Sequence, residues 1–158
     1  MNFSTNELTS YRAIELKCGF TLIEIIVTMG ILAIIGSIGL YVGLDQYRSY
    51  TLSAERNAVA AILQKARNQA MNNIAETPHG VSIQSGSYVL FYGPSYALRN
   101  TVYDEMLPKS VFITTGGDDE IVFNQLRGDV ATETGDIALS NGPKTYEISV
   151  NSEGRINW

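Results

Sequence analysis

The sequence contains one cysteine, Cys18, and one histidine, His79. A single cysteine excludes a disulfide within the chain and a cysteine-rich metal site. A single histidine excludes the common histidine-based zinc sites. Nucleophile-elbow and phosphate-loop motifs are also lacking. We therefore expect no metal, no cofactor and no enzymatic activity, and we expect His79, which follows Pro78, to lie in a loop.

Positive charge is scarce as well. The chain has 11 lysines and arginines against 16 acidic residues, a formal net charge of −5. Residues 77–158 hold five cations against ten acids. Proteins that bind nucleic acids normally carry a basic patch. The composition therefore disfavours a nucleic-acid partner, although five cations could still gather in space. They are Arg99, Lys109, Arg127, Lys144 and Arg155.

The acidic residues form two clusters in the second half of the sequence. A calcium site needs several oxygens that converge from a shaped loop, and neither cluster has the spacing of an EF-hand. We therefore expect solvated acids in turns. The clusters are Asp118, Asp119 and Glu120, and Asp129, Glu133 and Asp136.

Charge is almost absent between Phe20 and Leu44, where Glu24 is the only charged residue. A helix over residues 20–44 would be roughly 37 Å long, enough to cross a hydrocarbon core of about 30 Å. The run is longer than the apolar core of a secretory signal, about 7–15 residues, and no small-residue cleavage site follows it. It is apolar on every face. The sequence therefore predicts a retained transmembrane segment over 20–44, for which an uncleaved single-pass anchor is the simplest interpretation.

The basic residues around this run indicate its orientation. Arg12 and Lys17 precede it, and the first cation after it is Arg48. Positive residues favour the cytoplasmic side. We expect a cytoplasmic N-terminus in the inner membrane and a domain beyond residue 45 on the other side.

Glu24 is costly at this place. A carboxylate at the centre of a bilayer costs about 2.5–3.5 kcal/mol or more, and such residues usually mark function. Near the edge of the bilayer it could simply reach the headgroups. The alternative is that it meets a cation in an assembled state.

Helix-breaking residues are missing after the apolar run. No proline occurs before Pro78, and no glycine occurs between Gly43 and Gly80. Helix-favouring residues dominate this stretch, and apolar residues recur at helical spacing. We predict that one helix covers residues 20–76, with an amphipathic half at 45–76. The expected apolar stripe is Ala58, Val59, Ile62, Leu63, Ala66, Ala70 and Ile74.

Short alternating runs replace the helical period over residues 77–158. Turn residues separate them, which predicts about seven strands and an antiparallel β domain packed on the helix. The fold class is therefore α+β. The expected strands are GVSIQ, SYVLFY, SVFITT, EIVFNQ, DIALS, KTYEISV and GRINW.

The stretch GFTLIE, followed by IIVTMGILAII, resembles the signal of type IV pilins and type II secretion pseudopilins. The resemblance implies a leader peptide at 1–19 that a prepilin peptidase cuts between Gly19 and Phe20, with methylation of the new N-terminus at Phe20. It also implies that Glu24 pairs with the N-terminal ammonium of a neighbouring pilin or pseudopilin in a filament. A buried charge pair is strongly weakened by loss of one member, because the other is left uncompensated.

Two glycines in the apolar run, Gly39 and Gly43, form a small-xxx-small pattern typical of close helix packing. They could also be incidental, since glycine is common in such segments. Many major pilins carry a proline in this run, and this chain has none.

The C-terminal part is similar to the minor pseudopilin H and minor pilin T group. The matching residues are Ala66, Arg67, Ala70, Phe123, Gly128, Gly154, Arg155 and Ile156. The resemblance implies the type IV pilin-like fold and a minor structural subunit of a type II secretion pseudopilus or type IV pilus. The alternatives are a competence-type minor pilin that binds DNA and a plain anchored surface domain.

Overall fold

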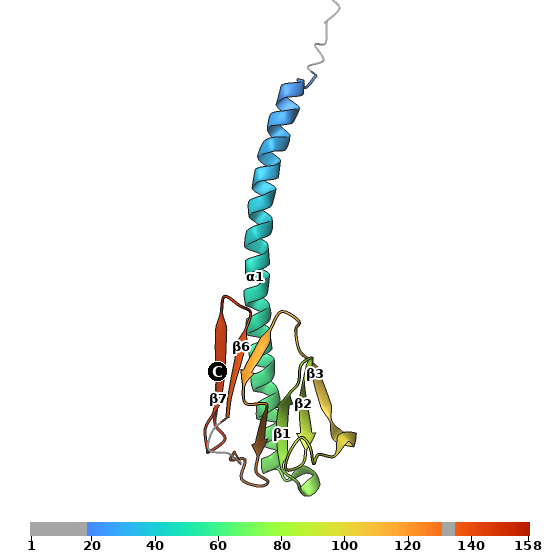
Figure 1. Cartoon of the computed structure of the whole chain (residues 1–158), viewed down its shortest axis with the longest axis vertical. Helices are drawn as coiled ribbons and strands as arrows, with labels where there is room; N and C mark the ends of the chain where they lie inside the picture. The colour runs from blue at the N-terminus through green and yellow to red at the C-terminus, as the bar shows by residue number, and fades with distance from the viewer. Residues whose placement is uncertain (1–18, 131–134) are drawn as a thin grey trace, which may run out of the picture. The chain divides into compact units, whose positions relative to one another are not determined.

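The computed structural model describes residues 19–130 and 135–158. Its first element is the helix α1, Leu22–Met71, and eight strands follow it. The chain divides into two units between Leu40 and Tyr41, and each unit is described by itself. This element order confirms the predicted α+β fold, in which one long N-terminal helix packs on an antiparallel β domain (Figure 1).

Helix α1 ends where the backbone turns left-handed. Asn73 has a φ of 56°, and the amide of Asn73 donates to the carbonyl of Ala70 (3.1 Å). A left-handed residue just after the last turn is a common way to end a helix. The amide of Leu126 also donates to the Ala70 carbonyl (2.9 Å). The predicted helix to residue 76 is therefore five residues too long, and residues 74–76 form a separate 3₁₀ turn.

The strands form two four-stranded antiparallel sheets. The first has the order β3-β2-β1-β5 and the second has the order β4-β6-β7-β8. Their bounds are β1 His79–Ile83, β2 Ser87–Tyr92, β3 Glu105–Pro108, β4 Thr114–Gly117, β5 Glu120–Phe123, β6 Gly135–Ser140, β7 Thr145–Val150 and β8 Ile156–Asn157. The chain passes from the second sheet back to the first between β4 and β5, through Asp118 and Asp119.

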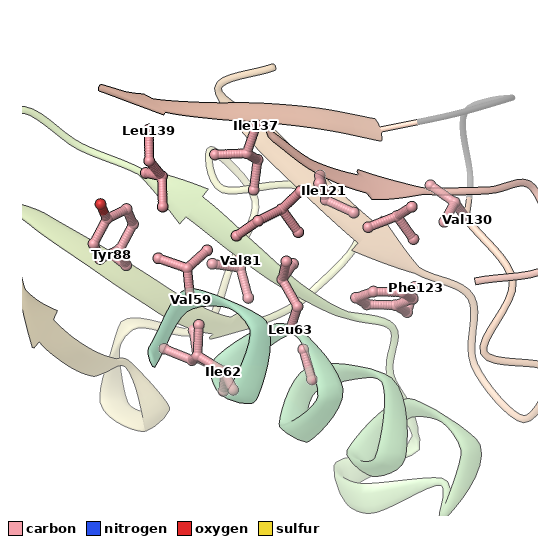
Figure 2. Close-up of a cluster of buried hydrophobic side chains, with 14 of the residues drawn as sticks. Val59, Ile62, Leu63, Val81, Tyr88, Ile121, Phe123, Val130, Ile137 and Leu139 are labelled. Atoms are coloured by element: carbon pink, nitrogen blue, oxygen red, sulfur yellow. The ribbon is translucent and has the colours of Figure 1, made fainter. Parts of the chain in front are cut away.

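Both sheets contribute to one hydrophobic core with α1. Val59 and Leu63 of α1 are fully buried, and they lie among side chains from the strands, including Val81, Phe123 and Leu139 (Figure 2). Burial of such side chains stabilises by about 1.5–3 kcal/mol each. The helix therefore supplies one wall of a core that the small β domain could not complete alone.

Most of the predicted stripe on α1 is buried, with exceptions at its ends. Ala58 is half-buried and Ile74 is 41% exposed, since Ile74 lies beyond the last turn of α1. Leu52 and Ala60 are buried although the predicted stripe omits them. The buried face of α1 thus begins and ends nearer the N-terminus than the predicted stripe does.

Three strand-level expectations are wrong. Strand β3 was not predicted, because it is a four-residue edge strand with mostly exposed side chains. The predicted strand SVFITT begins only at Thr114, and Val111 is 91% exposed rather than inward-facing. His79 is not in a loop, because it opens β1 and is fully buried.

Candidate N-terminal processing and assembly site

Gly19 and Phe20 directly precede α1. Both residues are exposed, and Phe20 exposes 79% of its surface. No side chain of the described residues lies within 4 Å of the position that a Cβ at Gly19 would occupy. Within the part of the chain that is described, the Gly19–Phe20 bond is thus sterically accessible. The remainder of the predicted leader, residues 1–18, lies outside the described residues.

Thr21 caps α1. Its hydroxyl accepts a hydrogen bond from the amide of Glu24 (3.3 Å), and its carbonyl accepts from the amide of Ile25 (3.2 Å). Thr-x-x-Glu is the sequence of a capping box, and the bond from the Glu24 amide to the Thr21 hydroxyl is the half of it that forms here. The T-x-x-E spacing at Thr21–Glu24 is a signal for the helix start that our sequence analysis did not use.

Glu24 lies in the first turn of α1. A carboxylate is favourable there, because the N-terminus of a helix carries a partial positive charge. No ion pair to Glu24 occurs among residues 19–130 and 135–158. Phe20 precedes the capping residue by one position. An amine generated at Phe20 would therefore begin the chain at the positive end of the same helix.

The apolar part of α1 has no buried residue within the described chain. Every residue of 20–47 is exposed, and Leu32 and Leu40 expose 67% and 72% of their surfaces. The helix is long and apolar enough to cross a membrane by length and composition. A monomer in water would leave this apolar surface hydrated, which costs about 25 cal/mol of free energy per Å² relative to burial. The segment therefore requires a lipid or protein environment.

Gly39 and Gly43 lie in α1 with open space where a Cβ would be. Apart from their neighbours in the helix, no described residue has an atom within 4 Å of either Cβ position. The described residues thus leave both positions open to close approach by another helix.

Three residues from the C-terminal resemblance come together in space. The guanidinium of Arg67 donates to the carbonyl of Gly128 (3.0 Å) and to that of Glu153 (3.1 Å). Gly154 follows Glu153 at a φ of +76°, and a Cβ there would collide with the carbonyl of Gly128. Arg67 therefore joins α1 to the loop after β5 and to the turn between β7 and β8.

Glu55 is a buried acid that sequence analysis missed. Its carboxylate accepts from the hydroxyl of Tyr88 (3.0 Å) and from the amide of Ser110 (3.0 and 3.2 Å). Tyr88 is fully buried, and burial, together with the nearby Glu55 charge, raises the pKa of its hydroxyl well above the usual value. The interruption of the apolar stripe at Glu55 could have signalled such a buried polar contact.

His79 packs its ring on that of Tyr92, with centroids 4.2 Å apart. Neither ring nitrogen has a hydrogen-bond partner among the described residues. Burial lowers the pKa of the imidazole below its ordinary value. These features describe a neutral core side chain.

Carboxylates of the acidic clusters accept hydrogen bonds from backbone amides, and one of these bonds joins the two clusters. The carboxylate of Asp118 accepts from the amide of Asp136 (2.9 Å), and that of Glu120 accepts from the amide of Tyr96 (2.9 Å). Glu133 lies outside the described residues. In the described ranges, no three histidine, cysteine or acidic residues are placed to hold a metal ion.

Comparison with known proteins identifies one feature. Residues 16–40 match the family model described as the prokaryotic N-terminal methylation motif. The match supports the resemblance of the N-terminal segment to type IV prepilins, and it covers only these residues. Neither a curated protein nor a solved structure matches the chain.

Proposed function

We propose that this chain is a prepilin-like subunit that is cut between Gly19 and Phe20, methylated on Phe20 and assembled into a filament through its N-terminal helix. The observation that carries the proposal is the coincidence of the methylation motif at 16–40 with an apolar helical segment in which no residue is buried. A membrane holds this surface before assembly, and neighbouring subunits cover it afterwards.

The role of Glu24 in this proposal is electrostatic. Its carboxylate meets the Phe20 ammonium of a neighbouring subunit, and the pair fixes the axial position of one helix against the next. The place of Glu24 in the first turn supports this role, because one helical turn separates the acid from the chain start that cleavage creates. Loss of the acid leaves a buried ammonium uncompensated.

Gly39 and Gly43 are proposed to let neighbouring helices approach closely. Small residues at this spacing bring helix backbones together in apolar surroundings. The open space at both positions supports the proposal.

The finer proposal is a minor subunit of a type II secretion pseudopilus or type IV pilus. Its support is the contact of Arg67 with Gly128 and Glu153, since Arg67, Gly128 and Gly154 are residues on which the resemblance to the minor pseudopilin H and minor pilin T group rests. Other pilins or pseudopilins are then its filament partners, and a prepilin peptidase is its processing partner.

The DNA-binding alternative has weaker support. Arg99 lies in an ion pair with Asp104 (2.8 Å), and Arg127 lies in one with Asp129 (2.6 Å). Cations engaged in this way contribute less to a basic patch. We therefore retain the structural role as the main proposal.

Co-expression of the full chain with a prepilin peptidase tests the processing step. Intact-mass analysis of the membrane fraction should show a chain that begins at Phe20 and carries one added methyl group. Gly19→Val is the matched variant, because a bulky side chain at the exposed Gly19 should block cleavage. A chain that still begins at Met1 in the presence of active peptidase would contradict the proposal.

Incorporation into filaments tests the role of Glu24. Glu24→Ala should be cut normally but should fail to enter sheared filaments. Asp45→Ala is the control, since Asp45 is an exposed acid of the same helix beyond the apolar run. Equal incorporation of both variants would remove Glu24 from the assembly mechanism.

A further inference from the structure

One end of the unit Tyr41–Trp158 faces back along α1 toward Leu44. Three connections lie there: the β1–β2 turn, and the two connections that bond to α1, between β3 and β4 and between β6 and β7 (Figure 1). We call this end the proximal face. It comprises α1 residues 45–50, the β3–β4 connection 109–113 and the β6–β7 turn 141–144.

Hydrogen bonds fix the two connections to the helix. The side-chain amide of Asn141 donates to the carbonyl of Arg48 (3.2 Å), and the ammonium of Lys144 donates to the hydroxyl of Ser49 (2.9 Å). The amide of Ser110 donates to the buried carboxylate of Glu55. Hydrogen bonds therefore hold both connections of the proximal face against α1.

The proximal face begins close to the end of the apolar run. Arg48 follows Leu44 by four residues, about 6 Å at ~1.5 Å per residue. A bilayer has a hydrocarbon core of about 30 Å within a total of about 40–45 Å, so each headgroup layer is roughly 5–7 Å thick. With the hydrocarbon boundary at Leu44, the β6–β7 turn lies at the outer limit of the headgroups.

The side chains of this face are those that favour a membrane interface. Val111 and Phe112, at the tip of the β3–β4 connection, expose 91% and 54% of their surfaces. Tyr47 and Tyr50 expose 59% and 75%. Tyrosine is enriched at the headgroup level of membranes. An exposed apolar pair at a loop tip favours an apolar partner surface.

The charge of the proximal face is opposite to that of the protein as a whole. Arg48, Lys109 and Lys144 are its bases and Asp45 is its one acid, which gives a formal charge of +2 on a chain with −5 overall. Basic residues at an anionic membrane surface contribute about 1 kcal/mol each. The sign and position of this charge fit anionic lipid headgroups.

We infer that the proximal face docks on an anionic bilayer surface, with Val111 and Phe112 in contact with the headgroup layer and Lys144 and Arg48 held at lipid phosphates. The inference rests on the proposed function, because it takes residues 20–44 as the membrane span. Docking fixes the orientation of the β domain before assembly and is released when the subunit leaves the bilayer.

Tryptophan quenching by brominated lipids tests this inference on the full chain in phosphatidylcholine–phosphatidylglycerol vesicles. All variants carry Trp158→Phe, which removes the single native tryptophan. In Phe112→Trp, lipids brominated near the glycerol should clearly reduce the emission. In Leu98→Trp the same lipids should not reduce the emission. Leu98 is 74% exposed and lies in the connection after β2. That connection begins beside Pro78, at the end of the unit opposite the proximal face.

A third variant separates the two proposals. Ile34→Trp lies in the middle of the apolar run and should be quenched by lipids brominated deep in the chain. If Ile34→Trp is not quenched, residues 20–44 do not span the bilayer, and the proposed function fails with the inference. If Ile34→Trp is quenched and Phe112→Trp behaves as Leu98→Trp does, only the docking inference is overturned.

Charge provides a second test. Lys144→Ala should shift the equilibrium between docked and free loop about fivefold toward the free loop, the equivalent of about 1 kcal/mol. Arg155→Ala removes the same charge from the turn before β8 and should have no effect. Equal effects of the two variants overturn the inference, as does unchanged quenching in pure phosphatidylcholine. If the emission of Phe112→Trp depends on the density of protein in the vesicles but not on bromine, a second copy of the chain covers this face, and the docking inference is overturned.

Discussion

The two halves of α1 differ in what covers them. Residues 20–47 are exposed on every face, whereas Leu52, Val59 and Leu63 in the second half are fully buried. The helix is continuous through Leu22–Met71, but only its second half is rich in strong helix formers, because the first half holds four glycines and many β-branched residues. Propensity and packing within the chain therefore explain the second half, and neither explains the first.

The difference shows where the missing partners must be. An amphipathic stripe needs one packed neighbour, and the two sheets supply it. A helix that is apolar all round needs apolar surroundings on all sides, as in lipid or in the core of an assembly. The first half is thus specified by an environment, and the second half is specified by a fold.

The sharpest test of this comparison removes the same side chain from each half. Leu63→Ala should lower the free energy of unfolding of the β unit by about 2–5 kcal/mol, because it leaves a cavity between α1 and the sheets. Leu32→Ala should leave it unchanged, since Leu32 is 67% exposed. Urea unfolding of the full chain in detergent, followed by Trp158 emission, measures both. A loss at Leu32 equal to that at Leu63 would show that the apolar half also packs within the chain.

The two acids Glu55 and Glu24 extend the comparison to polar groups. Glu55→Ala leaves the Tyr88 hydroxyl and the Ser110 amide without their acceptor, and bonds to a charged group contribute about 1.5–3 kcal/mol. We expect a loss of that size in the same urea experiment, and no loss for Glu24→Ala. Glu55→Gln is the matched control, because an amide oxygen still accepts from Tyr88 and should restore part of the stability. Identical curves for Glu55→Ala and the parent would show that the buried carboxylate is not used.

The glycines sharpen the comparison further. Gly154→Ala should destabilise by roughly 1–3 kcal/mol, because its φ of +76° strains an alanine and the new Cβ meets the carbonyl of Gly128. Gly142→Ala keeps the positive φ of +95° but has open space, so it reports strain without collision. Gly39→Ala should leave unfolding unchanged and affect only assembly. Thermal unfolding of the three variants should rank them in this order. Equal losses at Gly154 and Gly142 would remove the collision from the explanation.

Much of the fold could be predicted from local patterns. Hydrophobic period distinguishes the two halves of α1 from the strands, and the alternation at Ile137 and Leu139 is observed, whereas in β5 Val122 is buried together with Ile121 and Phe123. The failures lie where tertiary contacts decide. Strand β3 exists because β2 offers it an edge, and Val111 is turned outward in a connection that Ser110 anchors to Glu55.

The candidate site is predictable to a different degree. The motif over residues 16–40 is local, so sequence alone is enough to propose Gly19, Phe20 and Glu24 as candidates. The contact of Arg67 with Gly128 and Glu153 joins residues far apart in the chain, and only the fold brings them together. Spacing rules do not report such contacts, which is why the role of Arg67 was visible only as a resemblance.

The smallest expected effect is a pH dependence of the free energy of unfolding, and it arises only in the packed half of the molecule. His79 is the single histidine and lies in the packed unit, stacked on Tyr92, and burial lowers its pKa below the ordinary 6.5. The unfolded chain therefore binds a proton more readily than the folded one, so the contribution of His79 to stability is complete above pH 6.5 and falls as the pH drops below it. His79→Phe should flatten this part of the profile of unfolding free energy against pH, since phenylalanine can stack on Tyr92 without titrating.

Carboxylates with ordinary pKa values titrate at lower pH, near 4, so the difference between parent and variant just below pH 6.5 isolates the histidine. Parallel profiles for the two proteins in that window would mean that the imidazole finds a partner for its proton in the folded state.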